Sequence, residues 1–127
     1  MSYEFVIDTY AWVEYFRGSE EGKIAKDYIE NRIGVTSAIT LAELNEKYKR
    51  EGRNFEEDSE FIMSKTKIVN VNTEIALAAG DINFQNKKSI KNWGMADSII
   101  LATAKMLNAK VVTGDEHFRS FDVVMIR

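Results

Sequence analysis

The stretch Glu4-Phe5-Val6-Ile7-Asp8-Thr9 decides the fold, because a short apolar run ends there at an acidic residue and a helical pattern follows. Phe5-Val6-Ile7 is uninterruptedly apolar and rich in residues that favour β structure, which predicts a strand covered on both faces of a parallel sheet. Asp8 then lies at the carboxyl end of that strand, where open α/β sheets bind their ligands. The alternative is structural, since Asp8 or Thr9 can simply cap the next helix.

The composition is that of a folded chain without membrane-spanning segments. The 127 residues are 45% hydrophobic and 29% charged, and we expect one domain over residues 1–127. No apolar run approaches the roughly 20 residues that span a bilayer, and the amino terminus lacks the basic and apolar segments of a secretory signal. The absence of cysteine excludes disulfides and thiolate metal sites. We therefore expect a cytoplasmic protein with no membrane partner.

Helical and strand patterns alternate along the whole chain. The expected strands are residues 5–7, 33–36, 68–69, 110–113 and 123–126. Helices are expected to begin near Tyr10, Ser19, Ser37 or Thr40, Asn54, Thr73 and Met95. The last of these, through Ala104, is apolar on almost every side and should be central to the core. Strands separated by helices predict an α/β fold with a parallel sheet and helices on both of its faces.

Four acidic residues occupy comparable positions at strand ends or helix starts, and crossover topology can bring them to one edge of the sheet: Asp8, Glu43, Asp97 and Asp115. Each has a structural alternative. Glu43 follows Thr40 at the spacing of a capping box and can pair with Lys47. Asp115 can make an Asx turn or cap residues 116–118. Asp97 suits a helix start, but its apolar neighbours make an acid there costly without a partner.

Convergence of these carboxylates would raise some of their pKa values and destabilise the metal-free fold, and a divalent cation would relieve that cost. Ligands that are all carboxylates suit Mg²⁺ or Mn²⁺ rather than zinc or copper. One or two such ions can bind a phosphodiester, generate hydroxide and stabilise the leaving oxygen, so the natural reaction is phosphodiester hydrolysis. Thr9, Ser98 and Thr113 are placed to orient carboxylates or waters, or else to cap helices and strand ends.

Four stretches, in order and at their spacing, resemble the PIN domain family and within it the small VapC toxins. They are Val6 to Thr9, Ser37 to Leu44, Ala96 to Ala104 and Val112 to Phe118. The resemblance covers essentially the whole chain. It implies a three-layer α/β/α sandwich whose five-stranded parallel sheet has the order 3-2-1-4-5. It also implies an endoribonuclease that depends on Mg²⁺ or Mn²⁺.

The family pattern assigns the metal-binding and catalytic roles to Asp8, Glu43 and Asp97, with Asp115 as the fourth acid and Glu116 as an auxiliary one. The resemblance further implies a homodimer and a cognate antitoxin whose carboxyl-terminal segment blocks the acidic pocket. His117, the only histidine, lies in a turn, and we expect a structural or surface role for it.

Binding of RNA must depend on local patches, because the net charge of −3 gives no global positive field. Lys47, Lys49, Arg50 and Arg53 form one basic cluster, and Lys87, Lys88 and Lys91 form another beside Trp93. Either cluster can contact phosphates, and Trp93 can stack on a base. Solvated helix ends explain the same residues equally well.

Two other readings are open to such a chain. A receiver-like signalling module also has an acid after its first strand, but it needs an Asp after the third strand, where Asn70 stands, and a Lys after the fifth, where only Arg127 remains. A PIN-like domain without catalysis, serving as an RNA-binding or assembly module, is the second alternative. The intact acids argue against it, and metal binding distinguishes the two.

Overall fold

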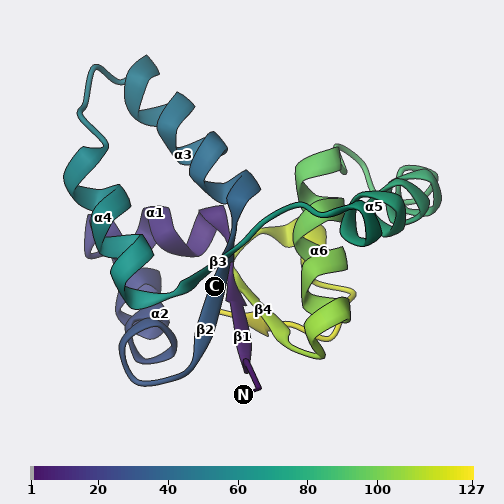
Figure 1. The fold of residues 1–127 in the computed structure, drawn as a ribbon, viewed down its shortest axis with the longest axis horizontal. Helices are drawn as coiled ribbons and strands as arrows, with labels where there is room; N and C mark the ends of the chain where they lie inside the picture. Colours follow the sequence, from purple (N-terminus) through teal and green to yellow (C-terminus); the bar gives the residue numbers. More distant parts are fainter. Residues whose placement is uncertain (1) are drawn as a thin grey trace.

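The computed structural model describes residues 2–127 and contains one five-stranded parallel sheet between two helical layers (Figure 1). The strands are β1 (Phe5–Ile7), β2 (Gly34–Ser37), β3 (Lys67–Val69), β4 (Lys110–Thr113) and β5 (Val124–Met125). Their order in the sheet is β3-β2-β1-β4-β5, which confirms the predicted order. β1 is the central strand and β4 is its parallel neighbour, so the residues that follow these two strands meet at the carboxyl end of the sheet.

The helices divide between the two faces of the sheet, with α1 to α4 on one side and α5 and α6 on the other (Figure 1). They are α1 (Thr9–Arg17), α2 (Glu20–Glu30), α3 (Ala38–Arg50), α4 (Glu56–Lys65), α5 (Thr73–Asn86) and α6 (Met95–Leu107), with a short 3-10 helix η1 (Glu116–Phe118) after β4. Within residues 2–127, none of these helices has the length and apolar character to cross a membrane.

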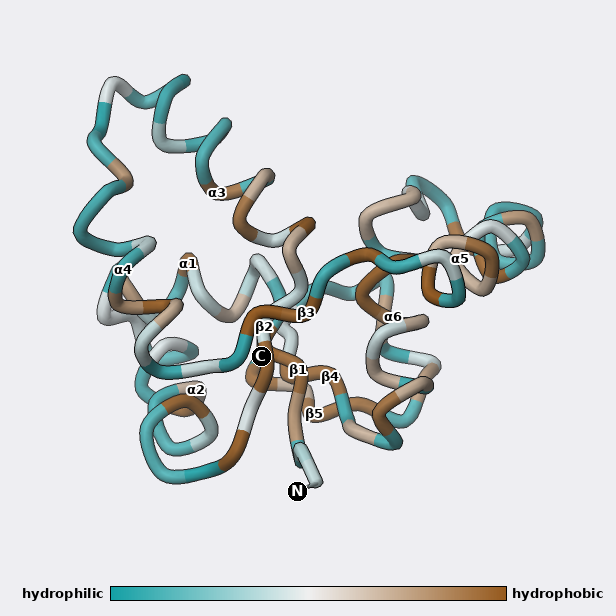
Figure 2. The backbone as a smooth tube through the Cα atoms, viewed as in Figure 1, coloured by the Kyte–Doolittle hydropathy of each residue, from teal (hydrophilic) through white to brown (hydrophobic). Residues whose placement is uncertain are grey.

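Alternating strand residues build two separate cores. Ile7 and Val112 pack with α1 to α4, whereas Val6 and Val111 pack with α6 on the opposite face. All four side chains are almost completely buried, as expected of central strands in a sheet covered on both faces. Figure 2 shows this pattern as hydrophobic strands at the centre of the molecule and mixed or hydrophilic helices around them.

Local signals fix the helix starts that position the site. Asp8 caps α1 through its side chain, which accepts a hydrogen bond from the Ala11 N–H at 2.8 Å. Gly18 ends α1 in the left-handed conformation, with φ 67°. Of the two caps predicted for the helix after β2, Ser37 is the one used, and α3 begins at Ala38. Thr40 is thereby free to face the site from the first turn of α3.

Trp12 connects the helical layer to the sheet. Its ring is fully buried, and its Nε1 donates a hydrogen bond to the Thr36 hydroxyl at 3.0 Å. Phe16 stacks on the ring with centroids 5.5 Å apart, and Phe61 of α4 packs against its face edge-on at 6.3 Å. These contacts hold α1 and α4 together, so the first turn of α1 has a fixed position over the sheet edge.

Gly22 is the point at which α2 approaches α1 most closely. A Cβ at this position would lie 2.0 Å from the Glu14 carbonyl oxygen, which is backbone and cannot move aside. We expect Gly22→Ala to destabilise the protein by about 1–3 kcal/mol, although alanine normally favours a helix. Gly80→Ala on α5 is the matched control: nothing lies within 4 Å of the added Cβ, so it should stabilise the fold by about 0.5–1 kcal/mol. Urea unfolding of both variants tests this, and a Gly22→Ala protein as stable as wild type would contradict it.

Candidate metal centre

The adjacent carboxyl ends of β1 and β4 bring Asp8 and Asp115 to one place. Ile7 of β1 is in register with Val112 of β4, and the Asp8 N–H donates to the Val112 carbonyl at 3.2 Å. The Thr113 side chain hydrogen-bonds the Asp8 carboxyl group, and its hydroxyl also accepts the Asp115 N–H at 3.0 Å. Thr113 thus links the two acids that follow these strands.

Asp8 is both a helix cap and a buried acid, with an exposed fraction of 3%. Burial raises the pKa of Asp8 to about 7, against hydrogen bonds from Thr113 and the Ala11 N–H that lower it. The negative charges of Asp115 and Asp97 raise the pKa further. The predicted capping role therefore holds for Asp8, and the ionised form of its carboxyl group is disfavoured when no cation is present.

The first turn of α6 supplies Asp97 beside the turn that follows β4. One Asp97 oxygen, Oδ2, accepts the Gly94 N–H at 3.1 Å and lies 3.1 Å from His117 Nδ1. His117 Nδ1 is also 3.6 Å from Asp115 Oδ1, and Asp115 Oδ1 accepts the His117 N–H at 2.9 Å. One ligand atom from each of Asp97, Asp115 and His117 lies within 4.8 Å of the others. These three residues form a compact group of two carboxylates and one imidazole.

Glu43 approaches the same group from α3. Its Oε1 accepts a hydrogen bond from the Thr9 hydroxyl at 2.6 Å, and that hydroxyl is 3.1 Å from the hydroxyl of Thr40. Partial burial raises the pKa of Glu43, the Thr9 hydrogen bond lowers it, and the charges of Asp97 and Asp115 raise it. Glu43 does not pair with Lys47, whose ammonium group binds Glu51 instead at 2.8 Å.

The four predicted acids therefore share one electrostatic environment. The negative charges of Asp97 and Asp115 raise the pKa of both Asp8 and Glu43, so the four carboxyl groups lie within range of one another's charge. A divalent cation is the simplest counter-charge for such a group. Carboxylate oxygens are ligands for both Mg²⁺ and Mn²⁺, and the additional imidazole nitrogen is a ligand that Mn²⁺ accepts. The donor set thus fits a divalent metal ion.

His117 is the residue of this group that the sequence did not identify. We expected a structural or surface role, but its ring lies between Asp97 and Asp115 and is only 27% exposed. The missed signal is its place two residues after Asp115, since an Asx turn folds the chain back and returns the side chain toward the acid.

Trp93 and Ser98 form a buried support beneath the start of α6. Trp93 Nε1 donates to the Ser98 hydroxyl at 2.7 Å, and that hydroxyl donates to Asn83 Oδ1 of α5 at 3.1 Å. Ser98 therefore holds Trp93 and α5 rather than orienting a carboxylate, which corrects that expectation. Trp93 is 1% exposed and packs on Phe118 and Phe121, so its ring has no free face for stacking on a base.

Glu116 is the other residue that the structure places away from the group. Its carboxylate is exposed and binds the Arg119 guanidinium at 2.6 Å, which lowers the Glu116 pKa. An auxiliary acid should face the other carboxylates, whereas the Glu116 carboxylate is at the surface and is paired with Arg119. The expectation of an auxiliary role is thereby corrected, and Asp115 is the acid that this turn directs to Asp97 and His117.

The predicted basic residues have different surroundings. Lys47 faces a groove beside α1, whereas Arg50 pairs with Glu46 at 2.9 Å on the exposed side of α3. Near the other cluster, Lys87 donates to the Trp93 carbonyl at 3.1 Å, and Lys88 lies 4.1 Å from the centre of the Phe84 ring. Lys91 is exposed. Lys47 therefore differs from Arg50, Lys87 and Lys88, because it lines a groove whereas they contact neighbouring groups of the protein surface.

The sheet order and the carboxylates at its edge define a class of α/β protein with an acidic, metal-compatible site. A family model described as the PIN domain matches residues 5–124. The chain therefore belongs to the PIN domain family. A search of curated protein sequences gives no match.

Solved structures with the same fold cover nearly the whole chain. A toxin–antitoxin complex from Klebsiella pneumoniae contains a chain 24% identical, with 98% of both chains covered and a TM-score of 0.79. A chain of DNA-bound VapBC from Salmonella typhimurium is 22% identical, covering 98% of this chain and 96% of its own, with a TM-score of 0.74. A chain of FitAcB from Neisseria gonorrhoeae is 24% identical, covering 97% and 96%, with a TM-score of 0.68. At these identities the similarity concerns the fold.

Proposed function

We propose that this protein is a metal-dependent endoribonuclease that hydrolyses phosphodiester bonds of cytoplasmic RNA and is inhibited by a cognate antitoxin. We further propose that residues 1–127 act as one domain and assemble as a homodimer. The single observation that carries the proposal is the convergence of buried and half-buried carboxylates with His117 at the carboxyl edge of the sheet. Such a site is poor at binding RNA by itself, because both are negative, and becomes suitable once a cation is present.

The residues that would hold the cation are Asp8, Asp97, Asp115 and His117, with Glu43 facing them. Mg²⁺ or Mn²⁺ bound there supplies an acidified water for attack on phosphorus and stabilises the leaving oxygen. Asp97 is held in place by the Gly94 N–H, and Asp8 by the Ala11 N–H and Thr113. Thr9 keeps one Glu43 oxygen oriented, which leaves the other oxygen for a water or the cation.

Support for an antitoxin comes from the proteins that share the fold. The solved structure from Klebsiella pneumoniae is a toxin–antitoxin complex, and the one from Salmonella typhimurium is VapBC bound to DNA. An antitoxin that covers an acidic site needs cationic side chains, because each carboxylate left buried without a counter-charge is costly. We therefore expect an arginine or lysine of the antitoxin to take the place of the cation.

Cleavage of a total cellular RNA pool by purified, antitoxin-free protein tests the proposal. We expect discrete fragments with Mg²⁺ or Mn²⁺, no cleavage with excess chelator, and recovery when metal is restored, because the carboxylates alone provide no counter-charge for the phosphate. A protein that is folded and binds the metal but leaves RNA intact would favour the alternative, a catalytically silent RNA-binding or assembly module.

His117 should make the site prefer Mn²⁺ over Mg²⁺, because imidazole suits Mn²⁺ better than the hard, oxygen-seeking Mg²⁺. We expect His117→Gln to weaken Mn²⁺ binding by about 10–100-fold and Mg²⁺ binding much less, as measured by isothermal titration calorimetry. Electron spin echo spectroscopy provides a second readout. The chain has a single histidine, so an imidazole ¹⁴N signal from bound Mn²⁺ in untagged protein can come only from His117. Equal losses of both metals, without a ¹⁴N signal in wild type, would contradict a ligand role.

A further inference from the structure

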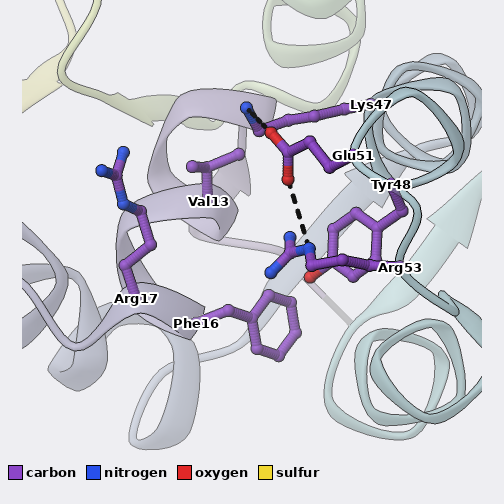
Figure 3. Close-up of a pocket in the computed structure, with 7 residues that line it drawn as sticks. All are labelled: Val13, Phe16, Arg17, Lys47, Tyr48, Glu51 and Arg53. Atoms are coloured by element: carbon purple, nitrogen blue, oxygen red, sulfur yellow. Dashed lines mark ion pairs between the residues drawn. The ribbon is translucent and has the colours of Figure 1, made fainter.

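A groove with a basic lining lies between α1 and α3, beside the candidate metal centre. It is lined on α1 by Val13, Phe16 and Arg17 and on the other side by Lys47, Glu51 and Arg53, and its volume is about 250 Å³. Figure 3 shows Arg17 on one side of the open space and the linked Lys47, Glu51 and Arg53 on the other. We call this feature the basic groove.

The charge of the basic groove is opposite to that of the whole protein. Three cations and one carboxylate line it, a net charge of +2, whereas the chain has a net charge of −3. Glu14, outside the lining, pairs with Arg17 at 3.3 Å and offsets part of this positive charge. Glu51 binds both Lys47, at 2.8 Å, and Arg53, at 3.2 Å, and so fixes two cations in place while neutralising only one charge. The side chains of Arg17, Lys47 and Arg53 are 68%, 32% and 50% exposed, so all three can reach a ligand.

Helical spacing connects the basic groove directly to the metal centre. Lys47 follows Glu43 by four residues on α3, and Val13 follows Thr9 by four on α1, so each pair lies on one helix face. The hydrogen bond from Thr9 to Glu43 joins the two helices at the site end. Both helices begin at the carboxyl end of the sheet; α1 extends toward α4, whereas α3 diverges from α1 and leads into α4 through the loop at its far end (Figure 1). Four helical residues rise about 6 Å, which is close to one nucleotide step along an extended strand.

We propose that the basic groove binds the backbone phosphate next to the scissile one, so that an RNA strand leaves the metal centre along α1 and α3. The proposal rests on the proposed ribonuclease function. A basic groove next to the acidic site provides a local positive potential that attracts RNA, which the negative overall charge of the chain does not provide. Lys47 and Arg17 contact the phosphate, and Arg53 adds to the positive potential from the far end.

The lining favours a phosphate over a base as the bound group. Tyr48, the aromatic residue at the floor of the groove, is 3% exposed, and the Arg53 guanidinium covers its ring at 4.0 Å. Phe16, the other aromatic residue of the lining, stacks on Trp12 and packs on Phe61, so neither ring offers a base a free face on which to stack. A cationic partner is disfavoured by the net positive charge. Recognition in the basic groove is accordingly electrostatic and independent of RNA sequence.

Salt-dependent RNA binding provides the test. The probe is a fluorescein-labelled, single-stranded RNA of eight nucleotides, and anisotropy is measured in chelator between 20 and 200 mM salt so that no cleavage occurs. Each phosphate contact contributes about 0.7 to the slope of log affinity against log salt. We expect Lys47→Ala and Arg17→Ala each to lower the slope by about 0.7 and to weaken binding about eightfold at 50 mM salt. Lys49→Ala is the matched control, since Lys49 is on the same helix but lines a different depression.

Glu51→Gln should have the opposite effect, because it removes the carboxylate that lines the basic groove and releases Lys47 and Arg53. Tighter RNA binding by this variant supports the proposal. Four results would each overturn it. Two concern the variants: weaker RNA binding by Glu51→Gln, or salt slopes that are unchanged in Lys47→Ala and Arg17→Ala. Two concern wild type: no RNA binding even at 20 mM salt, or displacement of bound RNA by a poly-Glu peptide at lower concentration than by unlabelled RNA. Since these measurements need no metal, they are independent of the cleavage test, and the two proposals can fail separately.

Discussion

Asp97→Asn should lower the rate of metal-dependent RNA cleavage by at least about 10²–10³-fold. Asp97 is the acid whose carboxylate touches both the helix start and His117, through Oδ2 contacts of 3.1 Å to Gly94 N and to His117 Nδ1. Asparagine has the same shape and can still accept the Gly94 N–H, so the cap of α6 is retained. What is lost is the negative charge, and the stabilisation that a bound cation gives to a phosphoryl transition state is worth several kcal/mol, about one decade of rate per 1.36 kcal/mol.

The matched control is Glu74→Gln, which removes a carboxylate from the first turn of α5 without touching the site. It should cleave RNA at the wild-type rate. Calorimetric melting and Mn²⁺ titration of the Asp97→Asn protein must accompany the rate measurement. A correctly folded Asp97→Asn protein that retains more than one-tenth of the wild-type rate would remove Asp97 from the proposed chemistry.

The sequence was sufficient to predict the sheet because its strands are short apolar runs between amphipathic helices. Phe5-Val6-Ile7 and Lys110-Val111-Val112-Thr113 form strands where they were expected, and they pair in parallel. Their order came from the family resemblance, because strand periodicity alone does not say which strands are neighbours. The last strand is shorter than expected, Val124–Met125 rather than residues 123–126. It is an edge strand of the sheet and pairs with β4 alone.

The site was predictable where a residue's position follows from the end of a strand or helix, and less so where it depends on tertiary packing. Asp8 and Asp115 come from adjacent strands, and Asp97 from the helix that packs on them. His117 and Trp93 were misjudged for one shared reason. Both lie in turns, where no periodic pattern indicates whether a side chain faces solvent or the interior. The Asx turn at Asp115 directs His117 inward, and contacts with Phe118 bury Trp93.

Asp8→Asn should stabilise the metal-free protein by up to about 4 kcal/mol at pH 8. The pKa of Asp8 is about 7 in the folded state against 3.8 for an ordinary aspartate, and each pKa unit corresponds to about 1.36 kcal/mol. A carboxyl group with a raised pKa binds its proton more tightly when folded, so the penalty is complete above pH 7 and disappears as the pH falls toward 4. Asparagine carries no such penalty and can still cap α1 through its side-chain oxygen.

The difference in unfolding free energy between Asp8→Asn and wild type should therefore shrink steadily from pH 8 to pH 4, as measured by urea unfolding in chelator. Glu43, whose pKa is also raised, makes wild type itself more stable over the same range as the pH falls. Asp122→Asn is the control and should change stability little at any pH, because Asp122 is an exposed acid that pairs with Lys110 at the surface. Saturating Mn²⁺ should stabilise wild type at pH 8 much more than Asp8→Asn, because the ionised carboxylate is then paired with the cation. A variant that is less stable than wild type at pH 8, or a difference that does not change with pH, would mean that Asp8 serves the fold as a cap and carries no electrostatic strain for a metal to relieve.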